Sequence, residues 1–184
     1  MSVILASQSP RRKELLELLN IPFTVRVADI DETMDPALSV AKAVARLSLR
    51  KAKAIPREKG DIVIAADTVV VCDGAVLGKP ADEADAFRML KLLSGRVHQV
   101  MTGITVLQDE KVICHTEITD VFFRTLTEEE IRAYIQSRDP MDKAGAYGIQ
   151  NGAAVFVEKI CGDYFNVVGL PVCKLSQILK EDFL

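Results

Sequence analysis

The hydrophobic and polar positions along the chain predict short strands that alternate with amphipathic helices. The most apolar predicted strand covers residues 61–72, where Ile62–Ile64 and Val69–Val71 are β-branched, as in a strand that is buried on both faces. Asp67 and Thr68 interrupt this apolar run. An ionised carboxylate is costly to bury unless it is paired or binds a cation, so we predict that Asp67 is a functional group. The alternative is an Asp that hydrogen-bonds to a neighbouring backbone group where the strand ends.

The other predicted elements follow from the same periodicities and from the turn and capping residues between them. Strands are predicted over residues 3–6, 23–27, 75–77, 97–107, 111–123, 154–160 and 165–168. Helices are predicted over residues 10–20, 36–54, 82–95 and 127–137, and from 171 onward. Asp73-Gly74 and Asp109-Glu110 are predicted hairpin turns, and Thr102-Gly103 is a predicted bulge. This mixture of elements predicts an α/β protein.

The start of the first predicted helix concentrates positive charge. Ser9 is the predicted N-cap and Pro10 the first helical residue, and Arg11, Arg12 and Lys13 follow at once. Cations in a first helical turn oppose the helix dipole, at a cost of some tenths of a kcal/mol each, and a bound anion reverses that sign. Backbone N–H groups, serine hydroxyls and guanidinium groups together predict a site for phosphate or polyphosphate. The alternative is an exposed basic turn.

An acidic loop and a lysine on the next helix are further candidates. The loop carries Asp29, Asp31, Glu32 and Asp35, and one or two of these carboxylates suit a divalent cation, whereas most acidic loop residues are simply solvated. Lys51 continues the apolar stripe formed by Val40, Val44 and Leu47. Such a lysine either extends to solvent at the end of the helix or points into a pocket.

Two later loops also carry candidate ligand-binding groups. Gly78-Lys79-Pro80 is a tight loop beside the predicted hairpin, and Lys79 can reach a phosphate there, although the spacing and Pro80 exclude a Walker loop. Gln150 lies in the segment 139–152, which contains three glycines. Its amide offers both a donor and an acceptor, which suits recognition of a base edge. A plain glycine-rich connection is the equal alternative on spacing alone.

The bulk composition limits the classes of protein that fit. With 184 residues, 49% of them hydrophobic and 27% charged, the chain has the composition of a globular protein, and we expect a single domain over residues 1–184. A net charge of -3 argues against a nucleic-acid-coating protein. Four cysteines without CxxC spacing and two histidines argue against structural zinc. We find no signal peptide and no membrane-spanning run, so we expect a cytoplasmic protein without a membrane partner.

Together these candidates form a polyphosphate clamp with carboxylates for a cation or a water. The clamp would consist of Ser9, Arg11, Arg12, Lys51 and Lys79. Neither a Gly-x-Ser-x-Gly elbow nor a Cys–His pair is evident, which disfavours nucleophilic catalysis by serine or cysteine. Metal-assisted hydrolysis of a phosphate anhydride fits the residues better.

The sequence resembles the Maf family of nucleoside triphosphate pyrophosphatases over nearly the whole chain. The form of residues 142–150 resembles the branch of the family that acts on dTTP and UTP, whereas the branch acting on 7-methylguanosine triphosphate differs there. The resemblance rests on Ser7-Gln8-Ser9-Pro10-Arg11-Arg12, Ala66-Asp67-Thr68, Gly78-Lys79-Pro80, Ser94-Gly95 with His98-Gln99-Val100, and Asp142-Lys143-Ala144-Gly145-Ala146-Tyr147-Gly148-Ile149-Gln150.

The resemblance implies a role for each candidate residue. Asp67 would be the general base that activates water, and Glu32 with Asp67 would bind a divalent ion, Mg²⁺ or Mn²⁺. The match to the family pattern can shift slightly along the acidic loop, so Asp31 is the alternative to Glu32. It can shift in the same way along the helix, so Lys53 is the alternative to Lys51, although the helical stripe favours Lys51. The other residues implied are Arg11, Thr68 and Gln150 for base preference, and Ser9, Arg12, Lys51 and Lys79 for the triphosphate.

The resemblance also implies a fold and an activity. The fold would be α/β, with an elongated mixed sheet flanked by helices and two lobes around a central cleft, as in inosine triphosphate pyrophosphatases, and often a homodimer. The activity would be hydrolysis of dTTP and UTP to the monophosphate and pyrophosphate. The alternatives are a non-catalytic nucleotide or phosphopeptide sensor that regulates cell division, a house-cleaning hydrolase of modified pyrimidine nucleotides, and, against the acidic pI, a nucleic-acid binder.

Overall fold

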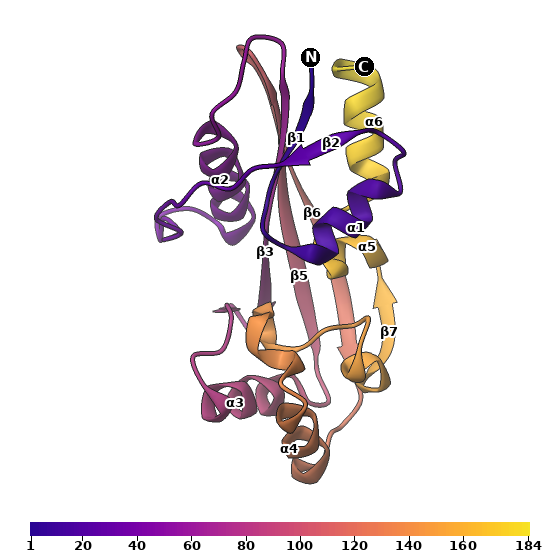
Figure 1. Cartoon of the computed structure of the whole chain (residues 1–184). Helices are drawn as coiled ribbons and strands as arrows, with labels where there is room; N and C mark the ends of the chain where they lie inside the picture. Colours follow the sequence, from indigo (N-terminus) through magenta and orange to yellow (C-terminus); the bar gives the residue numbers. More distant parts are fainter. The chain divides into compact units, whose positions relative to one another are not determined.

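A computed structural model, which describes residues 1–184, shows a mixed α/β fold built on a seven-stranded sheet flanked by helices (Figure 1). The strand order is β2-β1-β3-β5-β6-β7, and β4 pairs with β3. The sheet is mixed, because β1 is parallel to β2 and β3, whereas β3–β4 and β6–β7 are antiparallel. The fold class expected from the sequence is therefore confirmed. The strands are β1 Val3–Ala6, β2 Phe23–Val25, β3 Ile62–Cys72, β4 Ala75–Leu77, β5 Val97–Gln108, β6 Lys111–Phe123 and β7 Val157–Cys161.

The chain divides into two compact units, and each draws on separate stretches of sequence. The first unit comprises residues 1–68, 102–117 and 169–184, and the second comprises residues 69–101 and 118–168. Strands β3, β5 and β6 contribute residues to both units.

The first unit packs helices against the parallel strands. Its helices are α1 Pro10–Glu17, α2 Val40–Lys53 and α6 Val172–Asp182. Figure 1 shows α2 on one side of β1 and β3 and α6 on the other. Strand β3 is buried along nearly its whole length, as its β-branched sequence predicts. Helix α2 lies directly on β5 at Gly103, where a Cβ atom would stand 2.6 Å from the carbonyl oxygen of Val44. This close approach explains the glycine.

The second unit has its own apolar core, formed by helices and aromatic side chains. Its helices are α3 Glu83–Leu93, α4 Glu128–Gln136 and α5 Tyr164–Val168, with 3₁₀ turns η1 Asp139–Asp142, η2 Ala144–Ala146 and η3 Gly152–Phe156. Leu90, Leu93 and Ile131 are fully buried in this core. The rings of His98, Phe123 and Tyr147 meet edge to face beside them, with centroids 4.8–5.4 Å apart.

Side-chain caps mark the start of three helices, and the N-cap predicted at Ser9 is confirmed. The Ser9 side chain accepts a hydrogen bond from the backbone N–H of Arg12, and Asp82 caps α3 in the same way. Thr127 and Glu130 form a reciprocal capping box at the start of α4. Local chemistry therefore determines where these helices begin.

Several predicted elements are wrong or shifted. Helix α1 ends at Glu17 instead of residue 20, and strand β2 ends at Val25 instead of residue 27. Residues 165–168 form helix α5 rather than a strand, because the Asp163 side chain accepts from the backbone N–H of Phe165 and starts a helical turn. Helix α2 starts at Val40 instead of residue 36, because Asp35 caps a separate turn by accepting from the N–H of Ala37. Strand β7 starts only at residue 157, after η3. The predicted bulge at residues 102–103 lies within the continuous strand β5.

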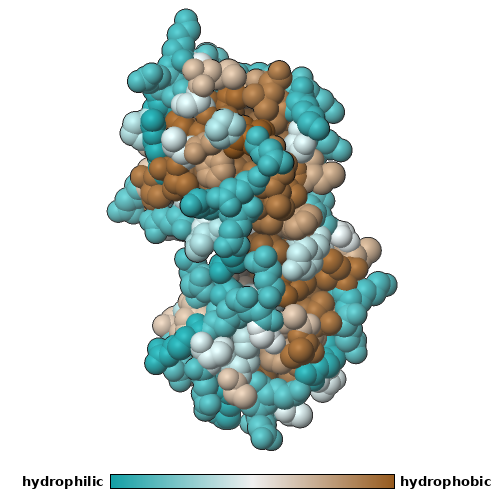
Figure 2. All heavy atoms as spheres, turned by 45° about the vertical axis from the view of Figure 1, so that its right-hand side comes forward, coloured by the Kyte–Doolittle hydropathy of each residue, from teal (hydrophilic) through white to brown (hydrophobic).

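Apolar side chains also reach the surface in places. Figure 2 shows one face of the molecule, on which brown apolar patches lie among teal polar side chains. Leu18 and Val155 are more than half exposed. None of the helices combines the length and the apolar character that crossing a membrane requires.

The buried imidazole of His98 leads to a pH prediction for stability. Only 2% of His98 is exposed, its Nε2 lies 2.9 Å from the Tyr147 hydroxyl, and its Nδ1 has no hydrogen-bond partner. Burial lowers the pKa of His98 from 6.5 to about 4. The unfolded chain therefore binds this proton near pH 6.5 and the folded protein only near pH 4. Stability should fall across that interval as the pH drops, by about 3 kcal/mol in total.

Urea unfolding across this pH interval measures the effect. The slope of the unfolding free energy against pH reports how many more protons the unfolded chain binds than the folded protein. In His98→Gln, this number should be smaller by about one than in the unmutated protein. An unchanged slope would show that His98 does not titrate in this way.

Candidate functional site

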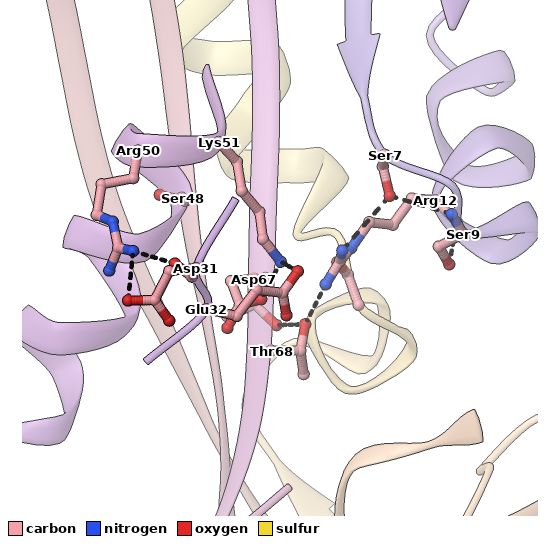
Figure 3. Close-up of polar contacts among 12 residues, drawn as sticks. Ser7, Ser9, Arg12, Asp31, Glu32, Ser48, Arg50, Lys51, Asp67 and Thr68 are labelled. Atoms are coloured by element: carbon pink, nitrogen blue, oxygen red, sulfur yellow. Dashed lines mark hydrogen bonds and ion pairs between the residues drawn. The ribbon is translucent and has the colours of Figure 1, made fainter. Parts of the chain in front are cut away.

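Arg12 connects the start of α1 to strand β3. Its Nε donates to the carbonyl oxygen of Gly169 at 2.9 Å, and its Nη2 donates to the Thr68 hydroxyl at 3.0 Å. Its Nη1 lies 3.5 Å from the Ser7 hydroxyl, and Ser9 caps the same helix (Figure 3). Three separate segments of the first unit therefore fix one guanidinium group at the middle of β3.

The electrostatic surroundings of Arg12 are mixed. Burial lowers the pKa of Arg12, Asp67 opposes that shift, and Arg11 adds to it. A guanidinium stays protonated under any physiological condition, so the site retains a positive charge with limited access to water. An anion placed here would interact with Arg12 and with the free N–H groups of the α1 N-terminus.

Lys51 lies between two carboxylates. Its Nζ is 2.6 Å from Asp67 Oδ1 and 3.0 Å from Glu32 Oε1 (Figure 3). The side chains of Lys51 and Asp67 are only 16% and 12% exposed, whereas that of Glu32 is 64% exposed. Lys53, the alternative to Lys51 in the sequence, is exposed. Asp67 is thus a nearly buried carboxylate paired with a lysine on α2, rather than a group that only binds nearby backbone.

Arg50 holds the acidic loop against α2. It donates to the carbonyl oxygens of Asp31 and Thr33, which are the residues on either side of Glu32. Asp31 itself accepts hydrogen bonds from the backbone N–H and hydroxyl of Thr33. The loop is therefore arranged with Asp31 turned to Arg50 and Glu32 turned to Lys51. This geometry supports Glu32 over Asp31 as the carboxylate beside Asp67.

The geometry adds residues that the sequence reasoning missed. Thr102 lies 2.9 Å from Thr68, between their hydroxyl oxygens, and so belongs to the same polar group. Arg50 acts on backbone carbonyls far away in sequence, and no sequence pattern signals such a contact. In the sequence, Thr102-Gly103 indicated only a possible backbone bulge. Nothing at that position indicated a role for the Thr102 hydroxyl.

The carboxylates of the site fit a divalent ion only in combination with other ligands. No group of three or more His, Cys, Asp or Glu side chains in the chain could hold a metal ion. Glu32 and Asp67 both contact the positively charged Nζ of Lys51, which shows that this position favours a cation. Mg²⁺ is commonly held by one or two carboxylates together with waters and substrate phosphates. The two side chains therefore fit an ion that arrives with a phosphorylated substrate.

The predicted site residues fall into two groups. The structure brings together Ser9, Arg12, Glu32, Lys51, Asp67 and Thr68 in the first unit. Arg11 is partly buried in the first turn of α1 in the same unit. Lys79 and Gln150 are exposed residues of the second unit.

Comparison with known proteins gives a consistent result. A family model described as "Maf-like protein" matches residues 2–182. A dTTP/UTP pyrophosphatase of Bacillus cytotoxicus is 51% identical over 179 residues, which cover 97% of this chain and 94% of that protein. A dTTP/UTP pyrophosphatase of Bacillus cereus is 49% identical over 180 residues, with the same coverage. Among solved structures, a HAM1 protein from Coxiella burnetii has a TM-score of 0.55 at 18% identity, covers 98% of this chain and 99% of its own, and shares the fold.

Proposed function

Because the chain belongs to the Maf-like protein family, we propose that it is a nucleoside triphosphate pyrophosphatase acting on dTTP and UTP. The products are the nucleoside monophosphate and pyrophosphate. The observation that carries this proposal is the arrangement of Asp67 and Thr68, which are neighbours on β3. Lys51 donates a hydrogen bond to Asp67, and Arg12 donates one to Thr68. Relatives with about half of their residues identical bear the name dTTP/UTP pyrophosphatase.

The triphosphate is bound by the cations and by the start of α1. Arg12 supplies a guanidinium already oriented by Gly169 and Thr68, and Ser9 supplies a hydroxyl beside the free backbone N–H groups. Lys51 exchanges its contact with Asp67 for a phosphate oxygen, and Lys79 adds a second ammonium group. Such positioning and charge neutralisation account for most of the rate in phosphoryl chemistry.

Asp67 acts as the general base. Its carboxylate takes a proton from a water molecule whose oxygen forms a bond to the α-phosphorus. The bond between the α-phosphorus and the bridging oxygen breaks, and pyrophosphate leaves with that oxygen. A divalent cation, Mg²⁺ or Mn²⁺, would be held by Glu32 and Asp67 and would neutralise charge on the phosphates.

The base is recognised by Arg11, Thr68 and Gln150. The amide of Gln150 offers a donor and an acceptor to the edge of a pyrimidine. Thr68 already contacts Arg12 and Thr102, which leaves one hydrogen-bonding position on its hydroxyl. A purine would leave these polar groups unpaired, and that loss discriminates between substrates.

The single domain over residues 1–184, a homodimer and a cytoplasmic location stay predictions.

A panel of nucleoside triphosphates, assayed with Mg²⁺ or Mn²⁺, tests the activity. Release of pyrophosphate and monophosphate should be fastest from dTTP and UTP. Release of single phosphate, or no release from any triphosphate, would contradict the proposed function.

Replacement of Asp67 tests the mechanism. Asp67→Asn should lower kcat on UTP by on the order of 10²- to 10⁴-fold, because the general base is lost, while UTP still binds. Calorimetric titration with UTP measures the binding. Asp109→Asn is the matched control, because Asp109 is an exposed turn residue of the same unit and Asn tolerates its positive φ of 50°. Undiminished turnover in Asp67→Asn would remove Asp67 from this role.

Replacement of Glu32 tests the cation site. Glu32→Gln should raise the Mn²⁺ concentration needed for half-maximal activity about tenfold or more, because one carboxylate is lost. The Mn²⁺ signal in electron paramagnetic resonance, recorded with UTP, reports binding directly. Asp31→Asn should stay close to the unmutated protein, and the reverse result would assign the ion to Asp31.

A further inference from the structure

The exposed Gln150 sits at the corner of a tight turn in the second unit. The backbone N–H of Asn151 donates to the carbonyl oxygen of Gly148 at 3.1 Å, which closes a turn with Ile149 and Gln150 at its centre. The Gln150 side chain is exposed. A turn of this kind, in a glycine-containing loop, directs its side chain only if both of its ends are fixed.

Both ends of this turn are connected to one carboxylate. At the first end, the N–H of Gly148 donates to the Tyr134 hydroxyl at 3.0 Å, and that hydroxyl donates to Asp139 Oδ2 at 2.5 Å. At the second end, Asn151 Nδ2 donates to Asp139 Oδ1 at 2.6 Å. The two oxygens of Asp139 thus hold the residues that precede and follow the central pair of the turn.

A buried lysine completes this network. Lys143 is 7% exposed, and its Nζ lies 3.0 Å from Asp139 Oδ1 and 2.7 Å from Asp142 Oδ1. Its aliphatic stem lies against Gly148, where a Cβ atom would be 2.6 Å from Lys143 Cε. The pKa of Asp139 is lowered because hydrogen bonds from Tyr134, Asn151 and Lys143 outweigh its burial. Asp139 therefore stays charged and keeps its donors in place.

A purely structural account explains this arrangement poorly. Two nearly buried charges cost desolvation free energy, and apolar packing of similar volume would hold a surface turn at least as well. What the network adds is a defined direction for the turn, because each hydrogen bond fixes an angle as well as a distance. Directional control matters for a turn whose exposed residue must meet a ligand.

We propose that Asp139 is a positioning residue, which acts through Tyr134 and Asn151 to hold the Gln150 amide in the orientation that recognises the pyrimidine edge. This inference rests on the proposed function and extends it from Gln150 to the side chains that fix its turn. Tyr134 and Asn151 connect Asp139 to the two ends of the turn, so their loss should change base selectivity more than it changes phosphate chemistry.

Tyr134→Phe is the sharpest variant, because it removes one hydroxyl and keeps the buried ring. The ratio of kcat/KM for UTP over that for CTP should fall about tenfold, with most of the loss in the UTP value. Tyr164→Phe is the matched control, since Tyr164 belongs to the same unit and its ring contacts only Phe165 in a ring pair. Asn151→Ala, at an exposed position, tests the other end of the turn without disturbing the core.

Two further measurements separate positioning from loss of folding. Amide exchange of Gly148 should speed up in Tyr134→Phe, because its N–H loses its acceptor. In a Gln150→Ala background, Tyr134→Phe should produce no further change in the UTP-to-CTP ratio, since both act on one group.

The outcomes are distinct. A lower ratio in Tyr134→Phe that vanishes in the Gln150→Ala background supports the inference. An unchanged ratio despite faster exchange of Gly148, or a change that adds to that of Gln150→Ala, overturns it while the pyrophosphatase activity stands. Absence of pyrophosphate release from the unmutated protein would overturn the proposed function and this inference with it.

Discussion

The ion pair between Lys51 and Asp67 is the contact on which the first unit depends. Desolvation of a carboxylate in a protein interior costs several kcal/mol, and Asp67 lies in a strand of aliphatic residues. The ammonium group at 2.6 Å offsets that cost and ties α2 to the middle of β3. Removal of Lys51 would leave the nearly buried Asp67 without the ammonium group that it contacts, whereas removal of Asp67 would leave Lys51 paired with Glu32 alone. The pair therefore constrains the helix and the strand at the same time.

Several of the proposed site residues are held in place by other groups of the same unit. Arg50 fixes the backbone on both sides of Glu32, and Gly169 and Thr68 fix the guanidinium of Arg12. Asp139 does the same for the turn around Gln150 in the second unit. In each case the supporting contact involves a backbone group or a side chain distant in sequence. Preorganisation of this kind reduces the entropy that a ligand must pay on binding.

Sequence reasoning succeeded where the signal is local. The Ser9 cap follows from residue types a few positions apart. The helical stripe favoured Lys51, which contacts Asp67, over Lys53, which is exposed. The apolar run around Asp67 predicted its burial. The same reasoning failed for residues 165–168, because the β-branched pair favours a strand, whereas the Asp163 side chain accepts from the backbone N–H of Phe165 and starts a helical turn.

The supporting side chains could not be predicted, for a related physical reason. The contacts of Arg50 are with carbonyl oxygens 17 and 19 residues away, and any residue type can provide a carbonyl. The path from Asp139 to Gly148 passes through a tyrosine that reads as an ordinary core residue of a helix. Periodicity identifies Tyr134 as buried, but it gives no information on what its hydroxyl contacts.

The interleaving of the two units has a consequence for how the protein forms. Residues 169–184 belong to the first unit, although the whole of the second unit separates them from residues 1–68. On the ribosome, the carbonyl of Gly169 that anchors Arg12 emerges only after residues 69–168 have been synthesised. The nascent amino-terminal segment therefore lacks the Gly169 carbonyl that anchors Arg12 until translation has passed the second unit.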